Sequence, residues 1–225
     1  MTTLAMQPPP SAPPQATTVG DLLERLGGIS PERIRLHPAP GTATERDLEF
    51  PSDGQKLLVE LIDGTLVEKT MGYFESRLAF VIGYFLESFL NDHDLGIFLG
   101  ADATLRYQPG LVRLPDGSFF SWNRFPNREL PSGAFIDFAP DLAIEVLSRG
   151  NTRREMARKR EECFAAGTKL IWEVDPRART VAVYSAPEAC LVVDENGVLD
   201  GGEVLPGFSL PVRQWFEQAA RKKAD

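Results

Sequence analysis

The chain has 225 residues, of which 43% are hydrophobic and 25% are charged, and its formal net charge at pH 7 is −8. These values are typical of one globular domain that can bury a sizeable core. The acidic net charge argues against a broad basic surface for nucleic acid, so any such contact should be local.

The first nineteen residues are rich in Pro, Ala, Thr and Gln and carry no periodic apolar pattern, so residues 1–19 are expected to form a disordered tail. They lack the charged and apolar regions of a secretory signal. No apolar run approaches the roughly 18 residues of a membrane span. We therefore expect a cytoplasmic protein without membrane contact. Its two cysteines lack CxxC spacing, which argues against a zinc site or a disulfide scaffold.

The N-terminal half of the folded chain shows three local patterns. Residues 20–50 should form an accessory segment, beginning with a short helix that ends at Gly27-Gly28, before a main domain over 51–225. Asp63-Gly64 joins two apolar-rich runs, which is a strong hairpin signal. Apolar residues at helical spacing then predict an amphipathic helix over 74–90.

The C-terminal half alternates strands with helices. Strands are predicted around 96–107, 111–113, 118–122, 141–147, 169–175 and 180–185. A helix should run from Thr152 to about Ala166 and end before Gly167, and a last short helix should lie within 210–223. This order favours an α/β domain with a mixed central sheet flanked by helices, in which 141–175 forms a right-handed crossover.

The strand around 141–147 carries a carboxylate, Glu145, inside an apolar run. Alternation places it on the face shared by Asp141, opposite Leu142. A buried carboxylate is costly unless a cation compensates it. Asp116, at the junction of two strand-like runs, is a second acid in a similar setting, and two carboxylates on adjacent strands can hold Mg²⁺ or Mn²⁺. The alternative is that Asp116 is a turn residue and Glu145 pairs with an arginine.

The helix that follows is rich in arginine and lysine. Most such runs are solvated faces with pairs at i,i+4. Because this helix directly follows the acid-bearing strand, Arg153 and Arg154 are also candidates for contacting nucleic acid. Lys159 shares the inward stripe with Met156 and Cys163, where an amine could contact a phosphate or activate water. Three further acids near element ends are expected to be solvated or capping residues: Glu60, Asp63 and Glu75.

Several segments in this order resemble the Uma-two family of restriction-endonuclease-like proteins, in the PD-(D/E)XK nuclease superfamily. The segments are ELIDGTLVEK, LPD, APDLAIEVLS and ARKREECFAAGTKLIWEVDP. The resemblance covers about residues 20–217 and implies a restriction-endonuclease-like core. It also implies that Pro115-Asp116 is the "PD", that Glu145 is the second acid, and that Glu75 is an additional acid from the first core helix.

The sequence departs from the superfamily pattern at two places. The lysine expected two positions after the second acid is replaced by Leu147, and the similar family places a lysine on the next helix, which matches Lys159. In addition, Gly117-Ser118 stands where an apolar strand residue is expected, which would loosen the strand locally.

Two functions remain open at this stage. The first is a metal-dependent endonuclease for DNA in which Asp116 and Glu145 bind Mg²⁺ or Mn²⁺ and Lys159 orients water or neutralises charge. The second is a catalytically inactive binding or regulatory module with the nuclease fold. Motifs of other hydrolases are absent from the sequence. A homodimer is also left open, because cutting both strands of a duplex favours two active sites.

Overall fold

A computed structural model describes residues 16–49 and 58–221, so most of the tail expected over 1–19 lies outside the described residues. A six-stranded sheet forms its centre, in the order β10-β9-β8-β7-β6-β3. Its strands are β3 (Gly96–Gly100), β6 (Gly117–Ser121), β7 (Leu142–Val146), β8 (Leu170–Asp175), β9 (Thr180–Ala186) and β10 (Ala189–Val193). Strands β7 and β8 are parallel and the other neighbours are antiparallel, so the predicted mixed sheet is confirmed.

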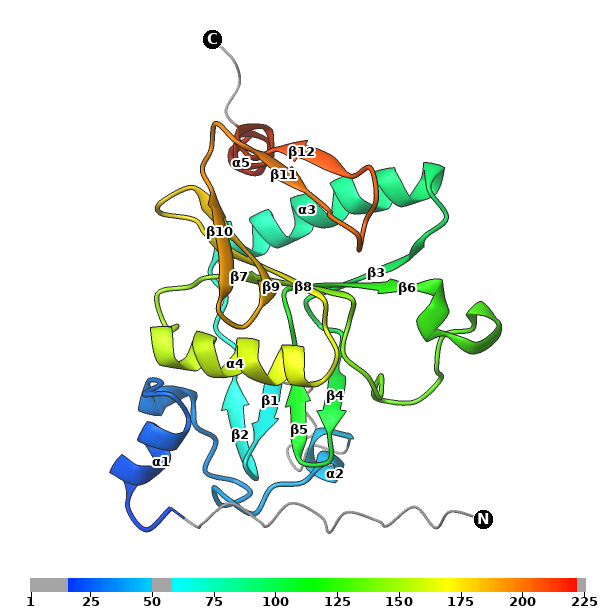
Figure 1. Ribbon diagram of the computed structural model, residues 1–225. Helices are drawn as coiled ribbons and strands as arrows, with labels where there is room; N and C mark the ends of the chain where they lie inside the picture. The colour runs from blue at the N-terminus through cyan, green and yellow to red at the C-terminus, as the bar shows by residue number, and fades with distance from the viewer. Residues whose placement is uncertain (1–15, 50–57, 222–225) are drawn as a thin grey trace.

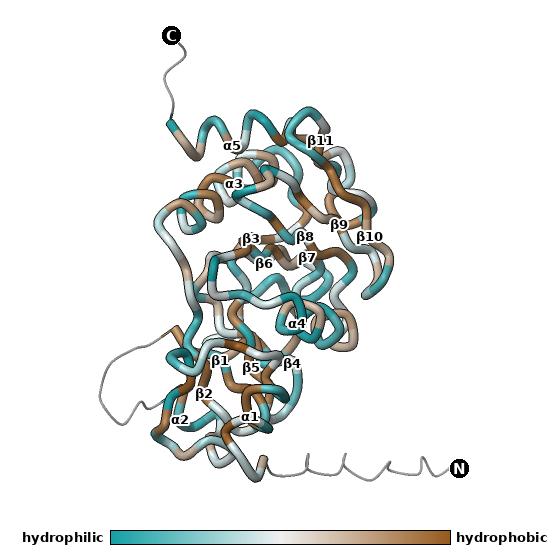
Figure 2. Tube along the Cα trace, turned by 90° about the vertical axis from the view of Figure 1, so that its left-hand side faces the viewer, coloured by the Kyte–Doolittle hydropathy of each residue, from teal (hydrophilic) through white to brown (hydrophobic). Residues whose placement is uncertain are grey.

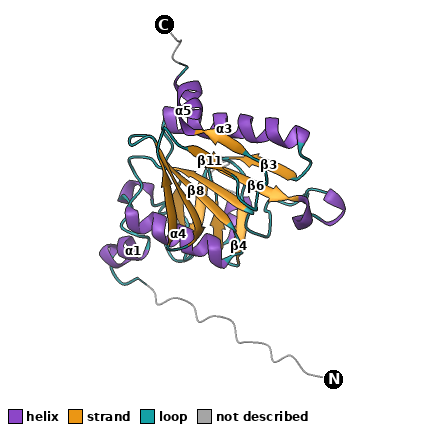
Figure 3. Cartoon of the chain, turned by 45° about the horizontal axis from the view of Figure 1, so that its top comes forward, coloured by secondary structure: helices purple, strands orange, loops and turns teal. Residues whose placement is uncertain are grey.

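Helices cover both faces of this sheet (Figures 1 and 3). Helices α3 (Tyr73–Asp92) and α5 (Val212–Ala220) pack on one face, and α4 (Arg153–Ala165) lies against the other. The alternation predicted for β7 is confirmed. Leu142, Ile144 and Val146 join the core beneath α3 and α5, whereas Ala143 packs with Cys163 of α4.

A second, four-stranded sheet lies on the far side of α4, with the order β2-β1-β5-β4. It contains β1 (Val59–Ile62), β2 (Thr65–Glu68), β4 (Leu105–Gln108) and β5 (Leu111–Arg113). The predicted hairpin joins β1 to β2, with positive φ angles at Asp63 and Gly64. The hydrophilic α4 therefore runs between the two sheets (Figure 2), and this arrangement brings charged side chains into the interior.

Smaller elements complete the described chain. They are α1 (Val19–Arg25), α2 (Glu45–Glu49), the hairpin of β11 (Val198–Asp200) and β12 (Ser209–Pro211), and short 3-10 turns at Pro31–Arg33, Trp122–Arg124 and Pro126–Arg128. Strands β10, β11 and β12 were not predicted. The run expected around 96–107 is two strands that belong to different sheets. No helix in the described part of the chain is long and apolar enough to cross a membrane.

The expectation that Gly117 loosens its strand is wrong. Gly117 is buried within β6 and is paired on both sides, with Gly100 of β3 and Ile144 of β7. A Cβ atom at this position would lie 2.6 Å from the Phe98 ring. Glycine is therefore required here because the aromatic ring occupies the space of a side chain.

The N-terminal segment docks on α4 through Gly27. The Thr152 hydroxyl, which caps α4, donates a hydrogen bond of 2.6 Å to the Gly27 carbonyl. Gly27 has a φ of +87°, and a Cβ atom there would lie 2.7 Å from the backbone of Glu155. This close approach places the segment against the start of the helix.

We expect Gly27→Ala to lower the free energy of unfolding by about 2–3 kcal/mol, because it adds a backbone clash to an unfavourable φ. Gly28→Ala is the matched control. Its φ is +72°, but a Cβ atom there has no neighbour within 4 Å, so the expected loss is only about 1 kcal/mol. Urea unfolding of both variants measures the difference, and equal losses would contradict the docking role of Gly27.

Candidate active site

A buried group of charged side chains lies where α4 passes between the two sheets. Its acids are Glu60 of β1, Asp116 directly before β6, and Glu145 of β7, and all three are buried. We call these three residues the acid cluster. Lys69, directly after β2, and Lys159 of α4 supply the nearest ammonium groups. The group surrounds a small cavity of about 20 Å³.

Backbone pairing and one lysine hold Asp116 in place. The pairing of β6 with β7 sets Gly117 opposite Ile144, which brings Asp116 alongside Glu145. One carboxylate oxygen of Asp116 accepts a hydrogen bond of 2.6 Å from the Val146 amide. The other oxygen lies 2.8 Å from Nζ of Lys69. Both oxygens therefore have a fixed partner.

Lys159 joins the other two acids. Its Nζ lies 2.8 Å from each oxygen of Glu145 and 3.0 Å from Oε1 of Glu60. The helical spacing that predicted an inward-facing Lys159 is confirmed, since Met156, Lys159 and Cys163 are all buried. The carboxylate of Glu145 inside an apolar strand is thus compensated directly, because a lysine from the next helix neutralises it.

Arg113 of β5 extends the ion-pair network away from the cavity. Its guanidinium, 1% exposed, lies 2.8 Å from Oε2 of Glu60 and also pairs with Glu162 of α4. Glu162 in turn accepts from Arg158, which reaches Asp63 in the hairpin turn at 3.0 Å. This chain of ion pairs ties α4 to the four-stranded sheet and fixes Glu60 from behind.

The cluster shifts the acidity of its members in different directions. Burial raises the pKa of Glu145 to about 7, and Asp116 adds to this rise while Lys159 opposes it. Burial also acts to raise the pKa of Glu60, but Lys159 and Arg113 hold that pKa well below its usual range. Although burial opposes it, Glu145 and Glu60 raise the pKa of Lys159 above its ordinary value. Lys159 is therefore a cation at neutral pH and cannot act as a proton acceptor.

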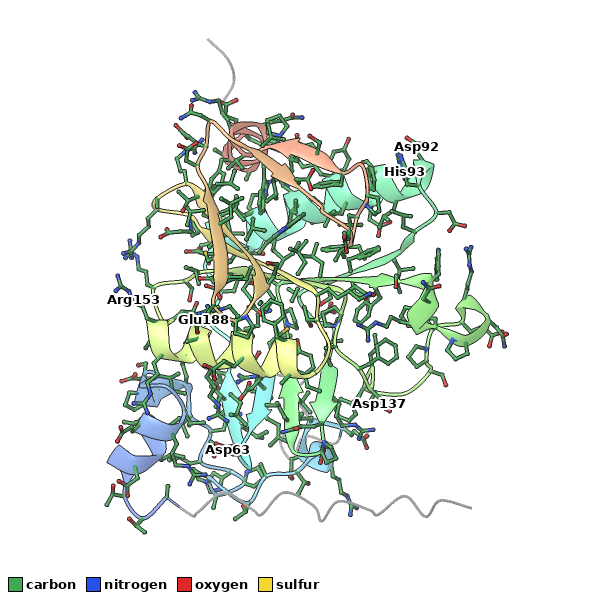
Figure 4. The ribbon with its side chains drawn as sticks, viewed as in Figure 1. Asp63, Asp92, His93, Asp137, Arg153 and Glu188 are labelled. Carbon is green, nitrogen blue, oxygen red and sulfur yellow. The ribbon has the colours of Figure 1, made fainter. Side chains whose placement is uncertain are left out.

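The other residues expected at a site lie elsewhere. Glu75, at the start of α3, lies over Gly72 and lines a neighbouring cavity. Arg153 points away from α4 into solvent (Figure 4), and Arg154 pairs with Glu24 at 3.2 Å. Asp141, at the opposite end of β7, binds Ser121, Arg124 and Lys169.

Three residues of the site were not predicted from the sequence. Glu60 was assigned to an element end, although it carries the same signal as Glu145, an acid within an apolar strand. Lys69 and Arg113 gave no signal of their own. Their roles follow from partners that are distant in sequence, Asp116 for Lys69 and both Glu60 and Glu162 for Arg113.

The acid cluster fits a hard divalent cation in its donor chemistry. Mg²⁺ prefers carboxylate oxygens and keeps several water molecules, so one or two protein carboxylates are sufficient. Asp116 and Glu145 provide these on neighbouring strands, beside a cavity with room for about one water-sized sphere. Within residues 16–49 and 58–221, no three acid, histidine or cysteine side chains are already arranged around a metal position. Water and substrate would complete the coordination.

Comparison with known proteins agrees with this fold. Residues 44–213 match the Uma2 family, described as "Putative restriction endonuclease", and because this match spans more than half of the sequence, the chain belongs to that family. The fold is similar to a crystal structure from Anabaena variabilis described as "a putative nuclease belonging to DUF820", with a TM-score of 0.68 at 22% identity. That match covers 78% of this chain and 97% of the other chain, and at this identity it shows the fold alone. No curated protein matches the sequence.

Proposed function

We propose that the protein is a metal-dependent endonuclease that hydrolyses phosphodiester bonds in DNA. The observation that supports this most directly is the pair of buried carboxylates, with Asp116 directly before β6 beside Glu145 of β7, and with Lys69 and Lys159 against them. Membership of the Uma2 family and the fold agree with it. The pKa of the buried Glu145 is raised, mainly by burial, and strongly perturbed acids of this kind cluster at functional sites.

Each side chain of the cluster has a role in this proposal. Asp116 and Glu145 hold Mg²⁺ or Mn²⁺, which supplies Lewis-acid stabilisation and a nucleophile at neutral pH. Lys159, permanently protonated, donates hydrogen bonds to the developing negative charge at the phosphate. Lys69 and the Val146 amide fix the orientation of Asp116. Glu60 positions Lys159 and keeps it charged.

The DNA backbone is proposed to pass through a cavity of about 490 Å³ next to the acid cluster. We call it the arginine-lined cavity, and its lining also contains the acids Glu75, Glu173 and Asp175. This cavity and the cluster share two lining residues, Asn151 and Met156. Exposed arginines without an ion-pair partner among the described residues line it: Arg149, Arg153 and Arg177. Arginines of this kind neutralise phosphates. Arg154, engaged with Glu24, is a weaker candidate than Arg153.

A second function is favoured by one specific observation. All four oxygens of Asp116 and Glu145 already have a protein partner, the two lysines and the Val146 amide. A cluster neutralised in this way is also what an inactive binding or regulatory module with the nuclease fold would contain. The two functions differ in metal affinity, which only the enzyme requires.

Cleavage of DNA with Mg²⁺ or Mn²⁺ tests the proposed function. Supercoiled plasmid, single-stranded DNA and branched DNA should each be incubated with metal and, as the control, with EDTA. We expect cutting of at least one substrate only when metal is present. Failure to cut any of the three with either metal would favour the inactive module.

Cutting of both strands of a duplex requires two active sites. A homodimer would provide them, and sedimentation would detect it. The cytoplasmic location stays a prediction from the sequence.

A further inference from the structure

An apolar cavity of about 480 Å³ adjoins the acid cluster at Asp116. It is formed between α3 and β3, and Asp116 itself lines one end. Two aromatic side chains of α3 stand in its wall with most of their surface exposed: Phe80 at 69% and Tyr84 at 56%. Arg77 lies over the Phe80 ring and the Phe85 ring meets Tyr84 edge-on, yet most of the surface of Phe80 and Tyr84 stays in water, where it can stack on a ligand.

The shape of this cavity depends on glycines. Gly83 and Gly117 both lie against the Phe98 ring, where added Cβ atoms would come within 2.8 Å and 2.6 Å of it. Phe98 is therefore held flat between α3 and β6, beneath the space next to Phe80 and Tyr84. The cavity is built from fixed, flat apolar surfaces.

The charged residues that line the apolar cavity indicate which part of a nucleotide it can bind. Its acidic lining residues are Glu87 and Asp116, and Glu87 accepts a hydrogen bond from the Phe98 amide at 3.3 Å. Among the residues that the structure describes, the lining contains no arginine or lysine that could bind a phosphate, whereas it suits a neutral ring with N–H donors. The arginines proposed to bind phosphate line the other cavity. The part of a nucleotide that suits this apolar cavity is thus its base.

We infer that this cavity binds an unpaired nucleobase of the DNA strand whose phosphate lies at Asp116 and Glu145. The substrate is then single-stranded or locally unpaired DNA. A base that is stacked inside a duplex cannot reach the cavity lined by Phe80 and Tyr84. Stacking on such side chains stabilises binding by about 1–3 kcal/mol for each base. This inference rests on the proposed function for the position of the phosphate, but base binding itself does not require cleavage.

Fluorescence of an oligonucleotide that contains 2-aminopurine tests the inference. Single-stranded and duplex forms of one sequence are titrated with the full chain in EDTA, so that neither is cut. We expect the single strand to bind about tenfold more tightly than the duplex, with a fluorescence change caused by stacking. Phe80→Ala combined with Tyr84→Ala should weaken single-strand binding by about tenfold and remove that change.

Tyr73→Ala is the matched control, since Tyr73 is an aromatic residue of α3 that is 99% exposed and lies outside the cavity lining. It should leave affinity and fluorescence unchanged. Equal binding of duplex and single strand, or an unaffected double variant, would overturn the inference. So would a change in sedimentation mass of the double variant, which would assign the aromatic residues to contact with a second copy. Base binding without metal-dependent cutting would leave the cavity assignment intact and reject the proposed hydrolysis.

Discussion

Glu145→Gln should reduce metal-dependent DNA cleavage by about a thousandfold or more while the fold stays intact. The amide keeps the shape of the side chain and one oxygen to accept from Lys159, but it removes the negative charge that binds a cation. Lys159 retains Glu60 as an anionic partner 3.0 Å away, so the interior keeps an ion pair. Initial rates of cutting on the best DNA substrate, with circular dichroism to confirm folding, measure the effect.

Glu75→Gln is the matched control for this variant. The resemblance to the nuclease family suggested Glu75 as a metal ligand, but its carboxylate lies over Gly72 at the start of α3 and lines the arginine-lined cavity. We expect its rate to stay within about threefold of the wild type, because Glu75 is not among the residues that line the small cavity at Asp116 and Glu145. Cleavage that survives in Glu145→Gln at the wild-type rate would show that the acid cluster is not the active site.

Lys159→Met should lower the free energy of unfolding by about 3–5 kcal/mol. The substitution preserves most of the side-chain volume but leaves Glu145 and Glu60 buried without the ammonium that lies within 3.0 Å of both. Uncompensated buried charge costs more than the ion pair gains, so the loss should be large. Urea unfolding at neutral pH measures it.

Two comparisons separate this electrostatic effect from a packing effect. Adding Glu145→Gln to Lys159→Met should restore at least about 1 kcal/mol, because it removes the carboxylate that has lost its lysine, whereas Glu60 keeps Arg113 as a partner. Arg154→Met, on the same helix but with a side chain 62% exposed, should change stability by less than about 0.5 kcal/mol. If Lys159→Met were as stable as Arg154→Met, the ion pairs around Lys159 would not hold the interior together.

Local patterns were sufficient to predict the elements that form the site. The period of two in β7 placed Glu145 on the face away from Leu142 and Ile144, and the helical period of α4 turned Lys159 inward with Met156. Asp63-Gly64 specified the hairpin because both residues adopt positive φ. In each case the information lies within a few residues of the feature.

The partners within the site could not be predicted in this way. The sequence shows that Glu145 needs a cation but does not show which one, and the structure places the Lys159 ammonium 2.8 Å from it. The basic helix was expected to face phosphate, yet Lys159, Arg158 and Arg160 pair with carboxylates of the chain itself. Such pairs join residues from different elements, so they become visible only when the two sheets close on α4.

Titration of Mn²⁺ into the wild-type protein and into Glu145→Gln, followed by calorimetry, is the most direct test of the central claim that Asp116 and Glu145 form a metal site. We expect the wild type to bind with measurable heat and the variant to lose that binding, while Glu75→Gln binds as the wild type does. Absence of binding to the wild type, or equal binding to Glu145→Gln, would contradict the claim and leave Lys69, Lys159 and Arg113 as the cations that neutralise the acid cluster.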